Sequence, residues 1–200
     1  MLAALYSQIA ATSPIEWLAV VSAIAYLFLA IRENIWCWLF AAISSASYIY
    51  LFIAALLYME SLLNAYYLVM AGYGWWVWSR KQDREGHRIV VTWPWQVHAV
   101  AIASILILSA GSAFLLSRYT DAALPFYDSL TTFGAFWTTF LVARKVFENW
   151  WYWLVIDAGS ILLYLSRDLY LTSLLFVVYL AMIPFGMIAW RRSMRIQGHA

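Results

Sequence analysis

The stretch Glu148-Asn149-Trp150-Trp151-Tyr152-Trp153-Leu154-Val155-Ile156-Asp157 decides how the rest of the chain is interpreted. Three tryptophans and an asparagine open an apolar segment, and a single aspartate follows about two helical turns later. At about 1.5 Å per residue, Asp157 lies roughly 10 Å beyond Trp150, well inside a bilayer if the tryptophans mark its edge. A carboxylate at that depth is costly, and such residues are functional by default.

The composition identifies an integral membrane protein, with the lipid bilayer as its surroundings. Of 200 residues, 66% are hydrophobic and 11% are charged, whereas soluble domains have about 25% charged residues. The net charge of +2 gives no reason to expect binding to nucleic acid. The single cysteine and three scattered histidines predict no disulfide, metal site or bound cofactor. The N-terminus lacks the basic and small-residue features of a signal peptide.

Seven apolar segments predict an all-α membrane protein with seven transmembrane helices. Each is close to the roughly 20 residues that a bilayer requires. The first begins at a capping box, Ser13-Pro14-Ile15-Glu16, with proline at the first helical position. Residues 79–92 form the one strongly hydrophilic loop. The predicted segments are 14–31, 35–54, 57–78, 94–116, 124–145, 150–165 and 169–190.

The distribution of basic residues predicts the orientation. Cytoplasmic loops carry an excess of Lys and Arg. With the N-terminus outside and the C-terminus in the cytoplasm, ten of the 12 basic residues lie at cytoplasmic helix ends. They are Arg32, Arg80, Lys81, Arg84, Arg88, Arg144, Lys145, Arg191, Arg192 and Arg195.

An internal similarity suggests a duplicated unit within a single transmembrane domain, residues 1–200. An offset of 115 residues aligns three tryptophan pairs: Trp36 with Trp151, Trp38 with Trp153, and Trp75 with Trp190. The sequence therefore predicts two parallel three-helix repeats, 14–78 and 124–192, joined by a connector helix at 94–116 (3+1+3). The alternative is that tryptophans gather at membrane interfaces without any duplication.

Five residues of the opening segment form the first candidate substrate site. The spacing i, i+3, i+7, i+10 and i+14 places them on one helix face, which we expect to look into the bundle because an aspartate facing lipid is untenable. They would offer a cationic pyridinium or thiazolium ring a stacking surface and a carboxylate. A structural aspartate, hydrogen-bonded between helices, is the alternative. The five residues are Trp150, Trp153, Asp157, Ser160 and Tyr164.

Four further residues join this candidate site. Asn64 and Tyr67 share a face of the third segment, and the Asn64 carboxamide could bind a ribose hydroxyl or only a neighbouring helix. At the offset of 115, Tyr179 corresponds to Asn64 and Trp38 to Trp153. Asp157 then corresponds to Ala42, so only one half supplies the carboxylate. Pro184, deep in the last segment, is a candidate gating hinge or a static kink.

Four motifs together resemble the bacterial nicotinamide riboside transporter (PnuC) family. They are Arg32-Glu33-Asn34-Ile35-Trp36, Leu63-Asn64-Ala65-Tyr66-Tyr67, Tyr73-Gly74-Trp75 and the opening stretch, within a similarity that spans about residues 14–192. The resemblance implies a SWEET-like vitamin transporter of the bacterial inner membrane that works by facilitated diffusion. It also implies that a cytoplasmic kinase traps the imported vitamin.

The resemblance leaves the vitamin open. Related members carry thiamine or riboflavin, and an asparagine is associated with nicotinamide riboside carriers at the place of Asp157. The predicted partner is therefore nicotinamide riboside, with thiamine and then riboflavin as alternatives; the sequence also leaves room for a homo-oligomer.

Other functions fit the sequence less well. A photoreceptor lacks its intramembrane lysine, and the apolar segments contain none of the usual motifs of an enzyme. A non-transporting assembly protein is the remote alternative.

Overall fold

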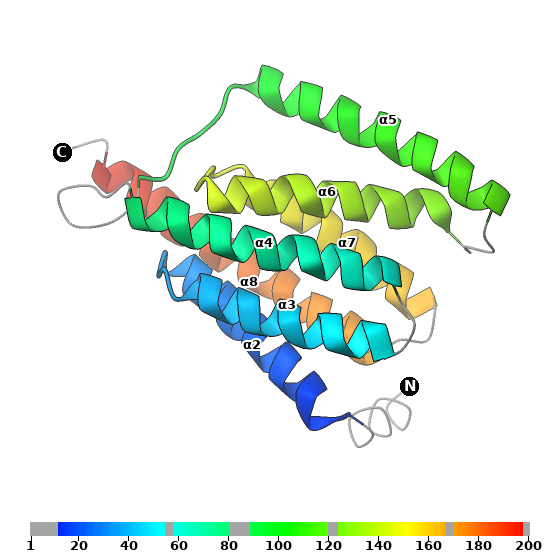
Figure 1. Cartoon of the computed structure of the whole chain (residues 1–200). Coiled ribbons are helices and arrows are strands. Elements are labelled where there is room, and N and C mark those ends of the chain that lie inside the picture. Colours follow the sequence, from blue (N-terminus) through cyan, green and yellow to red (C-terminus); the bar gives the residue numbers. More distant parts are fainter. Residues whose placement is uncertain (1–11, 55–57, 81–88, 120–123, 167–169, 198–200) are drawn as a thin grey trace.

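A computed structural model describes residues 12–54, 58–80, 89–119, 124–166 and 170–197. The regular elements in these ranges are seven helices that run alternately up and down (Figure 1). The helices are α2 (Pro14–Ile31), α3 (Cys37–Ala54), α4 (Tyr58–Arg80), α5 (Trp95–Tyr119), α6 (Pro125–Ala143), α7 (Asn149–Ser166) and α8 (Tyr170–Gln197). Among the described residues, the prediction of seven helices and no other large elements is confirmed. The predicted bounds differ by a few residues at most helix ends.

The helix starts follow from local sequence. Ser13 caps α2, because its hydroxyl accepts a hydrogen bond from the Glu16 amide at 3.3 Å, and Pro14 occupies the first turn. Pro125 likewise occupies the first turn of α6, without a side-chain cap. The largest difference from the predicted bounds is at the C-terminus, where α8 continues past Trp190 to Gln197.

Six helices form a closed ring, and α5 lies outside it. Neighbours around the ring follow the order α2, α3, α4, α6, α7, α8 and back to α2. Two contacts join the first half of the chain to the second: α4 packs against α6, and α8 packs against α2. α5 packs against α6 on the outside, set apart from the ring in Figure 1. Side chains pointing into the ring are therefore shared by both halves of the chain.

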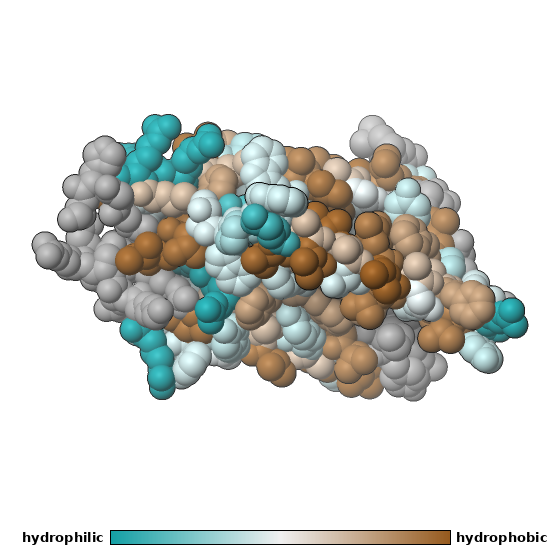
Figure 2. All heavy atoms as spheres, turned by 90° about the horizontal axis from the view of Figure 1, so that it is seen from above, coloured by the Kyte–Doolittle hydropathy of each residue, from teal (hydrophilic) through white to brown (hydrophobic). Residues whose placement is uncertain are grey.

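The surface and the helix composition fit a protein that crosses a membrane several times. Seen over α5, the middle of the molecule is largely apolar, and hydrophilic side chains gather mainly toward the ends (Figure 2). Among the described residues, four helical segments are long and apolar enough on their own to cross a membrane: α2, α3, α5 and Thr172–Ile196 of α8. The remaining helices, α4, α6 and α7, carry Asn64, Asp128 and Asp157 respectively.

The helix bounds of the two halves correspond at an offset of 112 residues, not the predicted 115. The ends of α2 and α6 are Ile31 and Ala143, and the starts of α3 and α7 are Cys37 and Asn149. The residues just after α2 and α6 agree as well, since Glu33 has a φ of 55° and Lys145 a φ of 53°. The offset of 115 was favoured because tryptophan is frequent near helix ends, so several alignments match one tryptophan to another.

Candidate substrate site inside the helix ring

Two buried tryptophan pairs hold the helices together near one end of the ring. The Trp38 and Trp78 rings meet edge to face with centroids 5.5 Å apart, and Trp150 and Trp190 meet in the same way at 5.4 Å. Gly74 faces Trp38 and Gly186 faces Trp150 so closely that an added methyl group would collide with the indole ring. The offset of 112 relates each member of one pair to a member of the other.

These pairs also join the two halves. The Trp78 indole N–H donates to the Ala143 carbonyl at 3.1 Å, and the Trp190 indole N–H donates to the Ala30 carbonyl at 3.0 Å. Each bond therefore runs from the last helix of one half to the end of the first helix of the other. Trp150 is 2% exposed, so its ring faces other helices and not the surface, whereas its neighbour Trp151 is exposed.

Trp38 and Trp150 leave polar atoms unused beside these contacts. Within the described part of the chain, neither indole N–H has a hydrogen-bond acceptor, although both atoms are buried. The Asn149 side-chain oxygen is also buried without a donor among the described residues, while its amide donates to the Val146 carbonyl at 2.7 Å. A buried N–H without an acceptor is costly, so each of these groups needs a partner that the described residues do not supply.

An ion pair joins the two halves at the same end. Lys145 Nζ lies 2.5 Å from Glu33 Oε2, and Lys145 is 1% exposed. The ammonium also lies 4.6 Å from the centre of the Trp78 ring, in the geometry of a cation–π contact. The prediction counted Lys145 among the basic residues at the cytoplasmic helix ends, but the structure buries it. A buried lysine is explained by its carboxylate partner, which sequence spacing could not show because the two residues are 112 positions apart.

Polar side chains converge inside the ring around Asp157. Asp157 on α7 is 4% exposed, and Ser160, one turn further along, is equally buried. The Tyr179 hydroxyl on α8 lies within electrostatic range of Asp157 and of three more tyrosines. These three are Tyr26 on α2, Tyr48 on α3 and Tyr67 on α4. Five of the six ring helices thus contribute a polar group to one region.

The predicted site residues fall into this arrangement in different ways. Asn64 is buried on α4, and Trp153 packs against the buried core next to Trp150. Trp38 lies close to the polar region, since its ring centre is 6.0 Å from that of Tyr26. Tyr164 belongs to α7, but its side chain is not among those that the structure describes. Pro184 is exposed within a continuous α8, and its role as a hinge stays a prediction.

Sequence reasoning missed Tyr26 and Tyr48. At the offset of 112, Tyr67 corresponds to Tyr179, Tyr48 to Ser160, and Ser45 to Asp157. The predicted counterparts, Asn64 for Tyr179 and Ala42 for Asp157, were therefore wrong by one helical turn. With the correct offset, Tyr48 would have been recognised as the partner position of a candidate residue.

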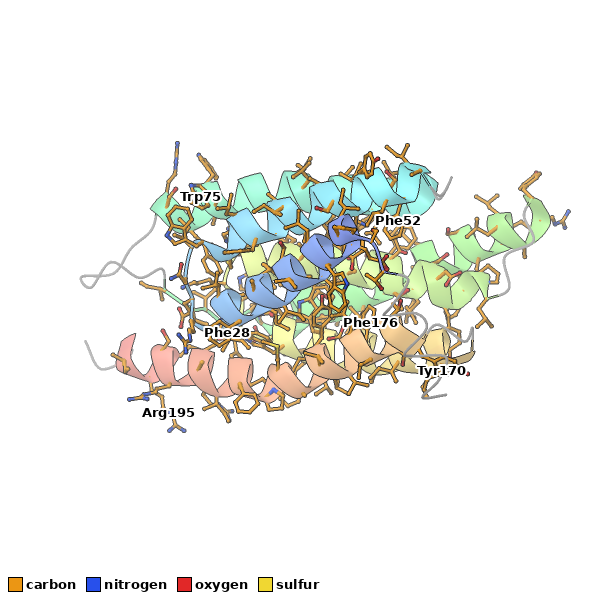
Figure 3. All side chains as sticks on the ribbon, turned by 90° about the horizontal axis from the view of Figure 1, so that it is seen from below. Phe28, Phe52, Trp75, Tyr170, Phe176 and Arg195 are labelled. Atoms are coloured by element: carbon orange, nitrogen blue, oxygen red, sulfur yellow. The ribbon has the colours of Figure 1, made fainter. Side chains whose placement is uncertain are left out.

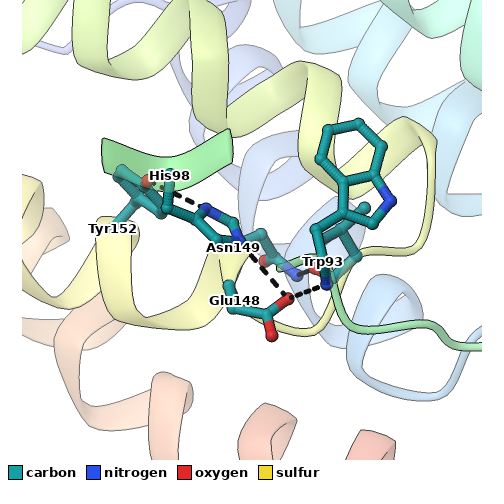
Figure 4. Close-up of polar contacts among 6 residues, drawn as sticks. Trp93, His98, Glu148, Asn149 and Tyr152 are labelled. Carbon is teal, nitrogen blue, oxygen red and sulfur yellow. Dashed lines mark hydrogen bonds and ion pairs between the residues drawn. The ribbon is translucent and has the colours of Figure 1, made fainter. Parts of the chain in front are cut away.

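A second polar cluster lies outside the ring, between α5 and α7 (Figure 4). His98 Nδ1 lies 3.0 Å from the Tyr152 hydroxyl, and Glu148 Oε2 accepts from the Trp93 amide at 3.3 Å. The backbone beside it pairs as well, because the Val91 amide donates to the Lys145 carbonyl at 3.0 Å and the Phe147 amide to the Val91 carbonyl at 2.8 Å. The segment that leads into α5 is thereby attached to the turn between α6 and α7.

Comparison with known proteins identifies the family. The model of the nicotinamide mononucleotide transporter family matches residues 13–192. The chain belongs to this family. It is 23% identical over 212 residues to the nicotinamide riboside transporter PnuC of Escherichia coli (strain K12), covering 92% of this chain and 89% of that protein. It is 25% identical over 169 residues to the riboflavin/roseoflavin transporter RibM of Streptomyces davaonensis, covering 82% and 78%.

The fold of this family member agrees with a solved structure. The crystal structure of the vitamin B3 transporter PnuC superposes with a TM-score of 0.75 at 21% identity, over 97% of this chain and 89% of the other. The resemblance inferred from the sequence motifs is thus confirmed at the level of family and fold. The matched proteins are transporters and not enzymes, in agreement with the sequence analysis.

Proposed function

We propose that this chain imports nicotinamide riboside across the bacterial inner membrane by facilitated diffusion. The observation that carries the proposal is the buried carboxylate of Asp157 inside a ring of helices, with the Tyr179 hydroxyl within electrostatic range of it. A pyridinium nucleoside carries a positive charge on an aromatic ring. Tyrosine faces and a carboxylate attract such a cation, and the low polarity around the site strengthens both attractions.

The sugar and amide of this substrate need hydrogen-bonding groups as well. The unused indole N–H groups of Trp38 and Trp150 and the unused oxygen of Asn149 would pair with them. Asn64 is the further candidate, since a carboxamide both donates and accepts. The proposed substrate-binding residues are the nine from the sequence analysis, to which Tyr26 and Tyr48 are added. The nine are Trp150, Trp153, Asp157, Ser160, Tyr164, Asn64, Tyr67, Trp38 and Tyr179.

The transport mechanism follows from the 3+1+3 arrangement that we propose for the chain. Helices α2–α4 and α6–α8 would be parallel repeats, with α5 as the connector. Matching helix bounds, matching tryptophan pairs and two equivalent contacts between the halves support it. Rocking of one repeat against the other would open the ring at alternate ends. The buried Glu33–Lys145 pair and the two indole-to-carbonyl bonds would then hold one end closed.

The closed end would face the cytoplasm. Arg32, Arg80, Arg144 and Arg191 all lie at this end of their helices, as the positive-inside rule requires for an outside N-terminus. Net import would then depend on a cytoplasmic kinase that phosphorylates the vitamin and so prevents its return.

Thiamine is the second candidate substrate. Its thiazolium ring is also cationic, so the carboxylate of Asp157 favours it for the same reason. Riboflavin is neutral and gains nothing from that charge. It remains the third candidate because the chain is similar to the riboflavin/roseoflavin transporter RibM.

The test is uptake of radiolabelled nicotinamide riboside, thiamine and riboflavin by proteoliposomes, with Asp157→Ala as the variant. The alanine removes both the charge and the hydrogen-bonding oxygens of the side chain. Loss of a charge-assisted contact costs about 1.5–3 kcal/mol, roughly tenfold or more in affinity. We expect this loss for the cationic vitamins, while Val155→Ala on the exposed face of α7 keeps normal uptake. Equal uptake of nicotinamide riboside by Asp157→Ala and the unaltered protein would refute the role of Asp157.

A further inference from the structure

A groove on the outer surface of α7 and α8 is separate from the substrate site. It has a volume of about 260 Å³ and opens away from the ring, since Trp151 and Ile188 are 53% and 68% exposed. On the same two helices, Trp150 and Trp190 point inward and are buried. The lining residues are Phe147, Trp151, Pro184, Met187, Ile188 and Arg191.

The groove is charged at one end only. Arg191 is the single charged residue of its lining, and its guanidinium lies 6.0 Å from the centre of the Phe147 ring. From Arg191 to Pro184 is seven residues, so the apolar part extends about 10 Å along α8 toward the middle of the molecule. Trp151 stands beside it, a residue type that membrane proteins place at the level of the lipid headgroups.

We infer that this groove binds one anionic phospholipid, with the phosphate on Arg191 and the first part of an acyl chain along Pro184 and Ile188. Three observations favour this occupant. The lining matches a molecule with one anionic end and one apolar end. The groove opens on a surface of exposed apolar side chains, and its charged end coincides with the basic ends of the helices. Guanidinium groups bind phosphate through paired hydrogen bonds, and anionic lipids concentrate where basic residues meet the cytoplasmic leaflet.

The first half of the chain offers an internal comparison. At the offset of 112, Ile188 and Arg191 correspond to Trp76 and Ser79 on α4. The nearby Arg80 guanidinium lies 4.4 Å from the centre of the Trp76 ring, closer than the 6.0 Å between Arg191 and the Phe147 ring. A bulky tryptophan replaces the isoleucine that borders the groove. The phospholipid site is therefore a feature of the second half.

The test measures melting temperature in a neutral detergent after addition of phosphatidylglycerol or phosphatidylcholine with identical acyl chains. Phosphatidylglycerol should raise the melting temperature of the unaltered protein, and native mass spectrometry should show one retained molecule. Arg191→Gln should weaken this retention about tenfold, the effect of losing a charged hydrogen-bonding partner. Arg191→Lys should retain part of it through its remaining charge. Ile188→Trp, which copies the residue of the first half, should abolish retention by filling the groove while leaving the arginine in place.

The control is Arg195→Gln. Arg195 lies one turn further along α8 and points away from the bundle (Figure 3), so its loss should leave the lipid effect unchanged. Equal effects of the two lipids, equal effects of Arg191→Gln and Arg195→Gln, or stabilisation by water-soluble glycerophosphate alone would each overturn the inference. Vitamin uptake by Arg191→Gln is measured in parallel. Normal uptake together with a lost lipid effect would show that the groove is separate from the substrate site at Asp157.

Discussion

Glu33 and Lys145 form a buried ion pair between residues that occupy the same position in the two halves of the chain. Each follows an α-helix by two residues, each has a positive φ, and they differ by 112 positions. A left-handed backbone is uncommon outside glycine. Because both residues adopt it, the two halves share the same turn geometry. The side chains at the two positions carry opposite charges.

Removing one partner of this pair should destabilise the protein strongly. Lys145→Met leaves the Glu33 carboxylate without its cation, and breaking a buried pair in this way costs about 3–5 kcal/mol. A large fall in melting temperature is expected for the single variants Lys145→Met and Glu33→Gln. Arg144→Gln, at the exposed neighbouring position, is the control and should change the melting temperature little.

Exchanging the two charges should restore part of the stability. In the double variant Glu33→Lys/Lys145→Glu, the new lysine would lie near Trp190, the counterpart of the Trp78 that Lys145 contacts now. The double variant should therefore melt well above Glu33→Lys alone. If the double variant melts no higher than Glu33→Lys alone, the two positions are not interchangeable and the two turns are not equivalent.

The two glycines beneath the buried tryptophans should respond alike to a methyl group. Gly74→Ala and Gly186→Ala force contacts with Trp38 and Trp150 that the rings cannot avoid without moving, and such overpacking costs about 1–3 kcal/mol. Gly72→Ala is the matched control, because nothing lies within 4 Å of an added Cβ there and alanine favours a helix. Melting temperatures should fall for the first two variants only. A tolerated Gly186→Ala would mean that Trp150 has room to shift.

Loss of the contact between α5 and α7 should affect stability more than transport. Tyr152→Phe removes the hydroxyl that lies 3.0 Å from His98 Nδ1, and a typical hydrogen bond contributes about 1 kcal/mol. The melting temperature should fall slightly, while proteoliposome uptake stays normal, because this contact lies outside the ring. Tyr50→Phe, on the exposed face of α3, is the control. An uptake defect at unchanged stability would indicate that α5 takes part in the transport cycle.

The sequence was most informative where a residue type has only a few physical uses. The apolar segments predicted each of the seven helices that the described residues form. The capping box at Ser13 and the proline at position 125 located two helix starts. The buried face of Trp150, Asp157 and Ser160 also followed from spacing, because an aspartate must avoid lipid.

Contacts between distant segments could not be predicted in the same way. Lys145 looked like an ordinary basic helix end because its partner Glu33 is far away in the sequence. The repeat offset was wrong by three residues, nearly one helical turn, and an error of that size keeps most residues on the same helix face. It therefore left the face assignments intact while assigning Asp157 the wrong counterpart.

The offset itself can be tested by moving the carboxylate. Asp157→Ser should lose uptake of nicotinamide riboside, because the site loses its charge. At the offset of 112 the equivalent position is Ser45, which is buried on α3. Ser45→Asp combined with Asp157→Ser therefore returns a carboxylate to the ring from the opposite half, and should recover part of the uptake. Ala42→Asp with Asp157→Ser is the matched control, since Ala42 is the counterpart at the offset of 115. Recovery in the Ala42 variant but not in the Ser45 variant, at equal protein levels in the membrane, would show that the halves correspond at 115 after all.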